Sequence, residues 1–272
     1  MIRKVLYFLQ VVRARAYVRV IGAQRELSWL AGDTILPFLT VCAYIFVYKA
    51  MKAPVEYTGF VVLGGVIMTF WAHMLWNMGM QLFWEKEVGN LARYLMTPMP
   101  RPALLLGMAL GGIIMTGSRA LIIYLASRFV FGVRFNISDP WLALLVFTAT
   151  LCALYGMGML LSSLFFIAGR GVNYGLQAMH EPIFFLGGFY FPVKRLGMFT
   201  AFSAAALIPT TLGLDALRQT MLGAYATGLI PPQTELAILV AMAIVFVWFS
   251  VVAMEKLEEL GRKYGRLTVK EQ

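Results

Sequence analysis

The chain has 272 residues, of which 60% are hydrophobic and 13% are charged, and its mean hydropathy is +0.76. A soluble domain cannot bury that much apolar surface, so the composition predicts an integral membrane protein. The formal net charge is +10, but no segment combines basic and aromatic residues in the way that nucleic-acid-binding surfaces do. We therefore expect no nucleic-acid partner and interpret the charge as a signal of membrane orientation and of contact with anionic lipids.

Residues 1–28 are predicted to form an amphipathic helix at the membrane surface. Its apolar face recurs at helical spacing and comprises Val5, Phe8, Leu9, Val12 and Ala16. Arg13 and Arg15 flank that face, where their side chains could reach lipid phosphates. A plain basic cytoplasmic tail is the alternative interpretation of this segment.

Six apolar runs are long enough to cross a bilayer, for which about 20 residues suffice. They are residues 29–50, 59–83, 103–131, 141–167, 174–193 and 236–254. A shorter run at 199–208 cannot cross, so we expect an outer re-entrant or interfacial element within residues 194–228. The sequence thus predicts an all-α membrane protein with six spans within residues 29–254 and a tail at 255–272.

The distribution of Lys and Arg predicts that both termini are cytoplasmic. With that orientation, more than twice as many basic residues fall on the cytoplasmic side as on the outer side, which agrees with the positive-inside rule. The even number of predicted spans is consistent with this arrangement.

Residues 84–101 form the only long polar segment between two apolar runs. Val88, Leu91 and Leu95 have helical spacing, which predicts a helix with one apolar ridge. The charged residues Glu85, Lys86 and Arg93 are expected to be exposed on its other faces. Thr97-Pro98 and Pro100 are expected to end the helix, because a proline disfavours helical geometry in the residue before it.

This segment resembles the first cytoplasmic loop of the permeases of ABC-2 type ATP-driven exporters. The positions that match are Glu85, Glu87, Gly89, Leu91, Thr97, Pro98 and Arg101. After the glycine the family usually carries Thr-Leu-Glu, whereas this chain has Asn90-Leu91-Ala92. The resemblance implies that residues 84–101, Arg93 and Leu95 included, form a coupling helix that contacts a separate ATPase.

A second stretch carries the same resemblance on the opposite side of the membrane. ABC-2 permeases typically show a glycine-rich aromatic segment that ends in Phe-Pro, followed by a short element with Pro, an acidic residue and Arg. The matching positions are Phe191, Pro192, Pro209, Asp215, Arg218 and Gly223. Gly187-Gly188 and Pro192 are predicted to break the fifth helix near the outer surface, where freed backbone groups need partners.

Asp215 and Arg218 are three residues apart and could form an ion pair that anchors the outer hairpin. Small residues suggest close contacts between helices. They are Gly107 and Gly111, Gly171 and Gly175, and the seam of Gly156, Gly158 and Ser162.

The resemblance implies a transport subunit with no bond chemistry of its own. The chain contains no G-x-x-x-x-G-K-[ST] phosphate loop, so ATP and Mg²⁺ are expected on a separate ATPase subunit, present in two copies. The family also implies a second permease copy in a homodimer, membrane lipids as neighbours, and the inner membrane of a prokaryote. We expect no catalytic residue, cofactor or metal in this chain, since His73 and His180 do not form a zinc motif.

Polar and charged residues inside spans are the candidates for a substrate path. Glu181, next to His180, could line this path, or it could pair with Arg119 or His73. Arg119 needs an acidic or carbonyl partner. His73 belongs to a polar and aromatic band that we interpret as a packed interior face.

The substrate is predicted only as a class. The polysaccharide-exporting branch often carries Arg-Tyr-x-x-Ser-x-Leu-Gly before the first span, and this chain has Arg25-Glu-Leu-Ser-Trp-Leu-Ala-Gly32 there. This departure favours an amphiphilic drug or lipid over a lipid-linked polysaccharide or glycolipid. An intramembrane lipid-modifying enzyme and a proton-driven carrier that uses Glu181 are the alternatives from other classes.

Overall fold

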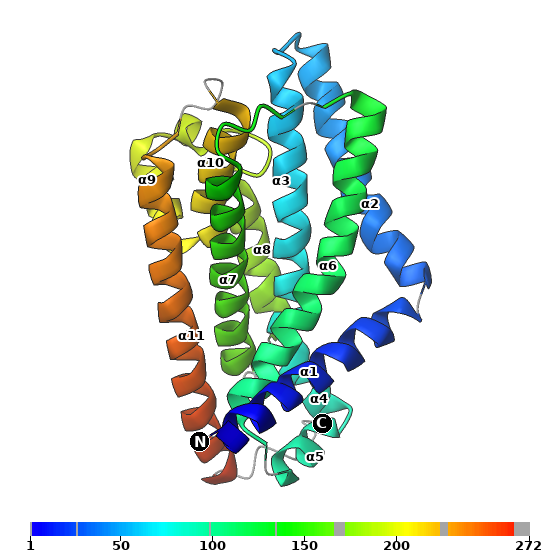
Figure 1. The fold of residues 1–272 in the computed structure, drawn as a ribbon, viewed down its shortest axis with the longest axis vertical. Helices are drawn as coiled ribbons and strands as arrows, with labels where there is room; N and C mark the ends of the chain where they lie inside the picture. Colours follow the sequence, from blue (N-terminus) through cyan, green and yellow to red (C-terminus); the bar gives the residue numbers. More distant parts are fainter. Residues whose placement is uncertain are drawn as a thin grey trace.

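The fold is a bundle of long helices (Figure 1). The computed structural model describes residues 2–25, 27–97, 99–133, 135–165, 172–223 and 228–263. Their elements are α1 (Ile2–Gln24), α2 (Leu27–Ala50), α3 (Glu56–His73), η1 (Met74–Gly79), α4 (Gln81–Glu87), α5 (Asn90–Met96), α6 (Arg101–Phe131), α7 (Pro140–Phe165), α8 (Val172–Leu186), η2 (Val193–Leu196), α9 (Met198–Leu207), α10 (Pro209–Leu222) and α11 (Pro232–Lys263). Every regular element in these residues is helical, which confirms the predicted all-α class.

Within the described residues, five apolar stretches of helix are long enough to span a membrane. They are Ala31–Ala50, Glu56–Glu87, Arg101–Phe131, Pro140–Leu164 and Pro232–Lys256. The expected span at residues 174–193 differs in form, because α8, which has 15 described residues, ends at Leu186, directly before Gly187-Gly188. A sixth apolar span arises only if α9 and α10, which bend by 110° at their junction, are counted together.

The second span is interrupted by a π-helical turn. The turn, η1, joins α3 to α4 within the continuous helical run Glu56–Glu87. Gly158 of α7 allows this region to pack closely, since a Cβ atom at that position would lie 2.7 Å from the Cγ atom of Met74. A π-helical turn widens a helix locally and is often found at functional sites.

α3 forms the centre of the bundle, whereas α2 and α11 lie at its periphery. In the span that contains α3, 83% of the apolar window is buried, and Val62, Ile67 and Trp71 have no exposed surface. Only 11% of the corresponding windows in α2 and α11 is buried. The apolar faces of these outer helices are therefore available to lipid or to another chain.

α1 crosses one end of the bundle beside α6, and α4 and α5 lie at the same end (Figure 1). We call this the α1 end and the opposite end the hairpin end, since η2, α9 and α10 lie there. Gly107 and Gly111 of α6 allow the close contact, because Cβ atoms there would lie 2.8 and 2.9 Å from those of Arg15 and Arg19. Gly175 has no such neighbour within 4 Å, and Gly171 lies outside the described residues.

Candidate functional site

The segment from residue 84 to residue 101 contains two short helices where the sequence predicts one. α4 ends at Glu87, and α5 begins at Asn90 after a turn at Gly89. Gly89 has a φ angle of 78°, a left-handed conformation that glycine adopts without steric cost. The predicted single helix is therefore wrong, because a turn at Gly89 separates two helices.

The end of α5 agrees with the predicted stop signal. The helix ends at Met96, and Thr97 is extended with φ of −87° and ψ of 140°. The Nη1 atom of Arg101 donates hydrogen bonds to the carbonyl oxygens of Tyr94 at 3.0 Å and Met99 at 3.2 Å, which closes the loop onto α6. Pro98 and the side chains of Leu91 and Leu95 lie outside the described residues, so the predicted apolar ridge is only partly placed.

Glu85 is buried, contrary to the prediction that it is exposed. Its side chain forms an ion pair with Arg15 of α1 and accepts hydrogen bonds from Gln81 at 2.9 Å and Asn90 at 3.1 Å. Arg15 also donates a hydrogen bond to the Tyr94 hydroxyl at 2.7 Å. Glu85 therefore joins α1, α4 and α5 and does not offer its charge to a partner.

The exposed surface of the α4–α5 segment is apolar and basic. Among the described side chains of this segment, Trp84, Val88, Arg93 and Met96 are exposed, and Glu87 beside them is partly exposed. Val88 and Met96 are 71% and 78% exposed. Large apolar side chains this exposed at the tip of a helical turn are typical of a protein-binding surface.

Two arginines of α1 have partners inside the protein. Arg15 pairs with Glu85 inside the protein, so it does not lie at the membrane surface beside the apolar face as predicted, whereas Arg13 is exposed. Arg19 donates hydrogen bonds to the side-chain oxygen of Gln81 and, at 3.1 Å, to the carbonyl oxygen of Asn77 in η1. Burial, together with the charge of Arg15, lowers the pKa of Arg19 to about 10, so that it remains charged at neutral pH.

Arg119 of α6 finds its partner in Asp33 of α2. The distance from Nη1 of Arg119 to Oδ2 of Asp33 is 2.6 Å, and the arginine is only 5% exposed. The sequence correctly indicates that Arg119 needs an acidic or carbonyl partner. The suggested pair with Glu181 is not formed: Glu181 is exposed on α8.

Two adjacent cavities surround this ion pair, and Asp33, Asn77 and Arg119 line both of them. The first has a volume of about 400 Å³ and is also lined by Arg15, Val18, Arg19, Gly22, Gln81, Glu85 and Met115. The second has a volume of about 350 Å³ and is also lined by Gly32, Leu36, Pro37, Thr69, Ala72, His73 and Trp76. Together they form a polar chamber at the α1 end and a less polar one between α2 and α3.

The two histidines make contacts with different helices. His73 is buried, with Nδ1 3.0 Å from the Tyr155 hydroxyl of α7, which agrees with its interpretation as a packed interior residue. His180 accepts a hydrogen bond from the Trp71 indole at 3.3 Å, and its ring lies 6.0 Å from that of Trp76. His180 thereby holds α8 against α3, whereas the neighbouring Glu181 is exposed.

At the hairpin end, Arg218 of α10 holds the backbone that follows α8. It donates hydrogen bonds to the carbonyl oxygens of Gly188 at 2.8 Å, Phe189 at 2.7 Å and Phe60 at 3.3 Å. Its guanidinium carbon lies 3.3 Å from the centroid of the Phe60 ring. Gly188 has a φ angle of 64°, so the break after α8 exposes carbonyl groups that Arg218 then satisfies.

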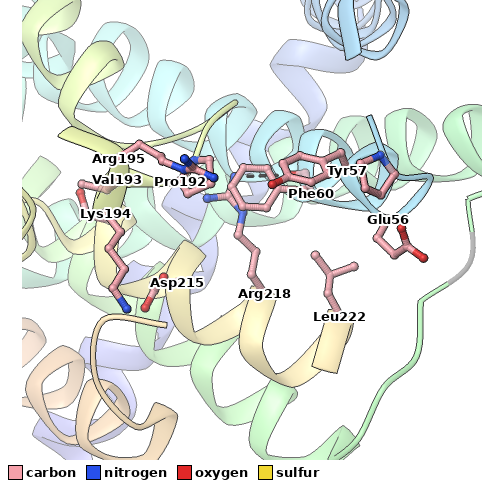
Figure 2. Close-up of a pocket in the computed structure, with 12 residues that line it drawn as sticks. Glu56, Tyr57, Phe60, Pro192, Val193, Lys194, Arg195, Asp215, Arg218 and Leu222 are labelled. Carbon is pink, nitrogen blue, oxygen red and sulfur yellow. Dashed lines mark hydrogen bonds between the residues drawn. The ribbon is translucent and has the colours of Figure 1, made fainter. Parts of the chain in front are cut away.

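The ion pair that we considered between Asp215 and Arg218 is not formed. Asp215 instead accepts hydrogen bonds from the backbone nitrogen of Leu229 at 2.6 Å and from the Gln219 side chain at 3.1 Å. Both residues line a cavity of about 390 Å³ between the start of α3, η2 and α10, together with Pro192 (Figure 2). Pro209 occupies the first turn of α10 and begins that helix.

Sequence reasoning missed several residues that the structure places at the α1 end. Asp33, Gln81 and Tyr155 lie in apolar runs, but their polar groups form hydrogen bonds with buried or partly buried side chains. Asp33 was detectable as the only acidic residue in the first apolar run. Arg19 had no such signal, because one of its acceptors is a backbone carbonyl in η1, and a π-helical turn is not visible in the sequence pattern.

These observations define a multi-span helical membrane protein with an exposed helical tip at α4 and α5 and with cavities within its bundle. Residues 19–222 match the family described as ABC-2 type transporter, which covers most of the chain, and the chain therefore belongs to that family. It is accordingly the membrane subunit of an ABC transporter, which is a transport protein. A comparison with curated proteins gave no match.

Proposed function

We propose that the protein is the permease of an ATP-driven exporter and that its α4–α5 tip binds a separate ATPase. The observation that carries this proposal is the exposed surface of Trp84, Val88, Arg93 and Met96, which belongs to the segment that matches the family's coupling loop. An apolar surface with a basic rim suits a soluble protein partner.

The contacts of the tip supply a route by which ATPase movement reaches the spans. α4 continues directly into η1 and α3, and Glu85 ties α4 and α5 to Arg15 of α1. α1 in turn packs on the glycines Gly107 and Gly111 of α6. A displacement of the tip therefore acts on the second and third spans together, and the mechanism is conformational with ATP and Mg²⁺ held by the partner.

The transporter is proposed to contain two permease copies and two ATPase copies in a prokaryotic inner membrane, with both termini cytoplasmic. A two-fold axis along the membrane normal would bring two identical faces together. The little-buried apolar surfaces of α2 and α11 support this proposal, because they remain available for a second copy.

The proposed substrate is an amphiphilic drug or lipid-like molecule that leaves the cytoplasm or the inner leaflet. The two adjacent cavities support this class, since one is lined largely by charged groups and the other includes Leu36, Pro37 and Trp76. A lipid-linked polysaccharide or glycolipid is the second candidate and is favoured by the same polar chamber. Membership of the transporter family argues against the enzyme and proton-driven carrier alternatives.

The ATPase contact is tested by Val88→Asp, with Val55→Asp as a matched control. Val55 is 80% exposed but lies beside the start of α3, at the hairpin end. A buried aspartate at a docking surface should weaken binding by about 2 kcal/mol or more. We expect Val88→Asp to lose co-purification with the ATPase and substrate-stimulated ATP hydrolysis, whereas Val55→Asp keeps both. Equal behaviour of the two variants would refute the docking role of the tip.

A further inference from the structure

We propose that the cavity between α1, α2, η1, α4 and α6 binds the phosphate group of an anionic lipid. Its charged and amide lining is formed by Arg15, Arg19, Asp33, Asn77, Gln81, Glu85 and Arg119. This inference deepens the proposed function by naming the substrate class. Only transport of the lipid rests on the proposed function. Binding itself requires no ATPase.

The charges in the cavity do not cancel. Arg15 is paired with Glu85 and Arg119 with Asp33, but the partners of Arg19 among the described residues are the Gln81 side chain and the Asn77 carbonyl oxygen. Three guanidinium groups therefore face two carboxylates. An arginine held by neutral acceptors keeps its full charge, and a planar guanidinium matches the oxygen atoms of a phosphate.

The arginines also have donors left over. The Nε atoms of Arg15 and Arg119 are buried, and within the described part of the chain they have no hydrogen-bond partner. Buried donors without partners leave positive charge in this region uncompensated. A phosphate brings negative charge to this region, whereas a zwitterionic choline headgroup adds a cation to a space that is already positive.

The second cavity favours a lipid over a free phosphate ion. It shares Asp33, Asn77 and Arg119 with the first cavity and continues past Leu36 and Trp76 toward the middle of α2. α2 is little buried, so this side of the bundle is close to the membrane. A headgroup in the first cavity could thus keep its apolar chain beside α2, and basic pockets between membrane helices are known to hold anionic headgroups.

The binding experiment uses the purified permease without the ATPase. Short-chain phosphatidylglycerol, short-chain phosphatidylcholine with the same acyl chains, and inorganic phosphate are titrated, and binding is followed by native mass spectrometry. We expect phosphatidylglycerol to bind at least tenfold more tightly than the other two. Equal affinity for phosphatidylcholine would overturn the anion site, and equal affinity for inorganic phosphate would overturn the lipid as its source.

Arg19→Gln and Arg13→Gln form the matched pair of variants. Both remove one positive charge from α1, but Arg13 is exposed and does not line the cavity. Arg19→Gln should lower phosphatidylglycerol affinity at least tenfold, and Arg13→Gln should change it less than twofold. Equal losses of affinity in both variants would show that the lipid is attracted by surface charge in general. Unchanged affinity in Arg19→Gln would refute the proposed site.

A second variant decides the case if Arg19→Gln does not fold. Gln81→Glu places a carboxylate beside Arg19, so the excess charge is neutralised while the arginine remains. We expect the same tenfold loss of phosphatidylglycerol binding, and unchanged binding overturns the proposal. The Val88→Asp variant separates this inference from the proposed function, since it should lose the ATPase but keep the lipid.

Discussion

Arg119 and Asp33 are 86 residues apart in the sequence, yet their side chains meet at 2.6 Å in a partly buried contact. The pair joins α6 to α2, a helix of which only 11% of the apolar window is buried. The Arg119 side chain is 6% exposed and that of Asp33 is 39% exposed. If the contact is broken, water can therefore solvate Asp33 but not the buried Arg119.

Asp33→Asn should destabilise the protein, because it leaves the buried charge of Arg119 without its counter-ion. Breaking a fully buried pair costs about 3 to 5 kcal/mol, and partial exposure of Asp33 reduces our expectation to about 1 to 3 kcal/mol. Thermal unfolding in detergent measures the effect. The double variant Asp33→Asn, Arg119→Gln should regain part of the loss, and a double variant less stable than Asp33→Asn would contradict this interpretation.

Gly64→Ala should prevent correct docking of the segment that follows α8. A Cβ atom at Gly64 would lie 1.6 Å from the carbonyl oxygen of Phe189, which is one of the acceptors of Arg218. Backbone atoms cannot yield as a side chain does, so we expect a loss of at least about 1 to 3 kcal/mol. Gly175→Ala is the control, since no atom lies within 4 Å of that position. Similar melting temperatures for both variants would be inconsistent with the close approach.

Gly89→Ala should weaken coupling to ATP hydrolysis without a steric clash. The φ angle of Gly89 is 78°, and no atom lies within 4 Å of a Cβ atom built there. A left-handed conformation costs an alanine about 1 to 2 kcal/mol, so the turn between α4 and α5 should shift. Gly89→Asn should be milder, because asparagine tolerates this conformation. ATPase stimulation by the permease is the measurement, and equal stimulation by wild type and Gly89→Ala would rule out the role of the turn.

Cysteine labelling tests the orientation that the basic residues predict. Cys42 and Cys152 are first replaced, and single cysteines are then placed at Lys52 and at Arg93. Lys52 follows α2 at the hairpin end, and Arg93 is exposed on α5 at the α1 end. An impermeant thiol reagent should label residue 52 and not residue 93 in intact cells. The reverse pattern would place the α4–α5 tip outside the cell.

Glu181→Gln should change transport while leaving the fold intact. Glu181 is exposed on α8, and Arg119 already has Asp33 as its partner, so removing the carboxylate breaks no buried ion pair. We expect altered export of cationic amphiphiles, measured in inverted vesicles, with unchanged thermal stability. Lower stability of Glu181→Gln would show that the carboxylate is structural, and unchanged transport of cationic and neutral substrates would remove it from the substrate path.

The local pattern of the sequence determined the all-α membrane class of the protein, the positions of most spans and the family. Apolar runs longer than a bilayer is thick can be satisfied only as helices, and the segments around Gly89 and Arg218 carried the resemblance that the family match confirms. The pairing requirement of Arg119 also followed from sequence, since a charge in a span needs a partner.

Tertiary structure decided which partners meet. Glu85 is buried because α1 folds back across α6 and brings Arg15 to it, and the glycines that permit this contact lie more than 80 residues from α1. Arg218 does not bind the nearby Asp215 because the broken end of α8 offers it unpaired carbonyl groups. Which side chains pair depends on their proximity in three dimensions and on the cost of leaving buried polar groups without hydrogen bonds. Neither can be predicted from the spacing of residues along one helix.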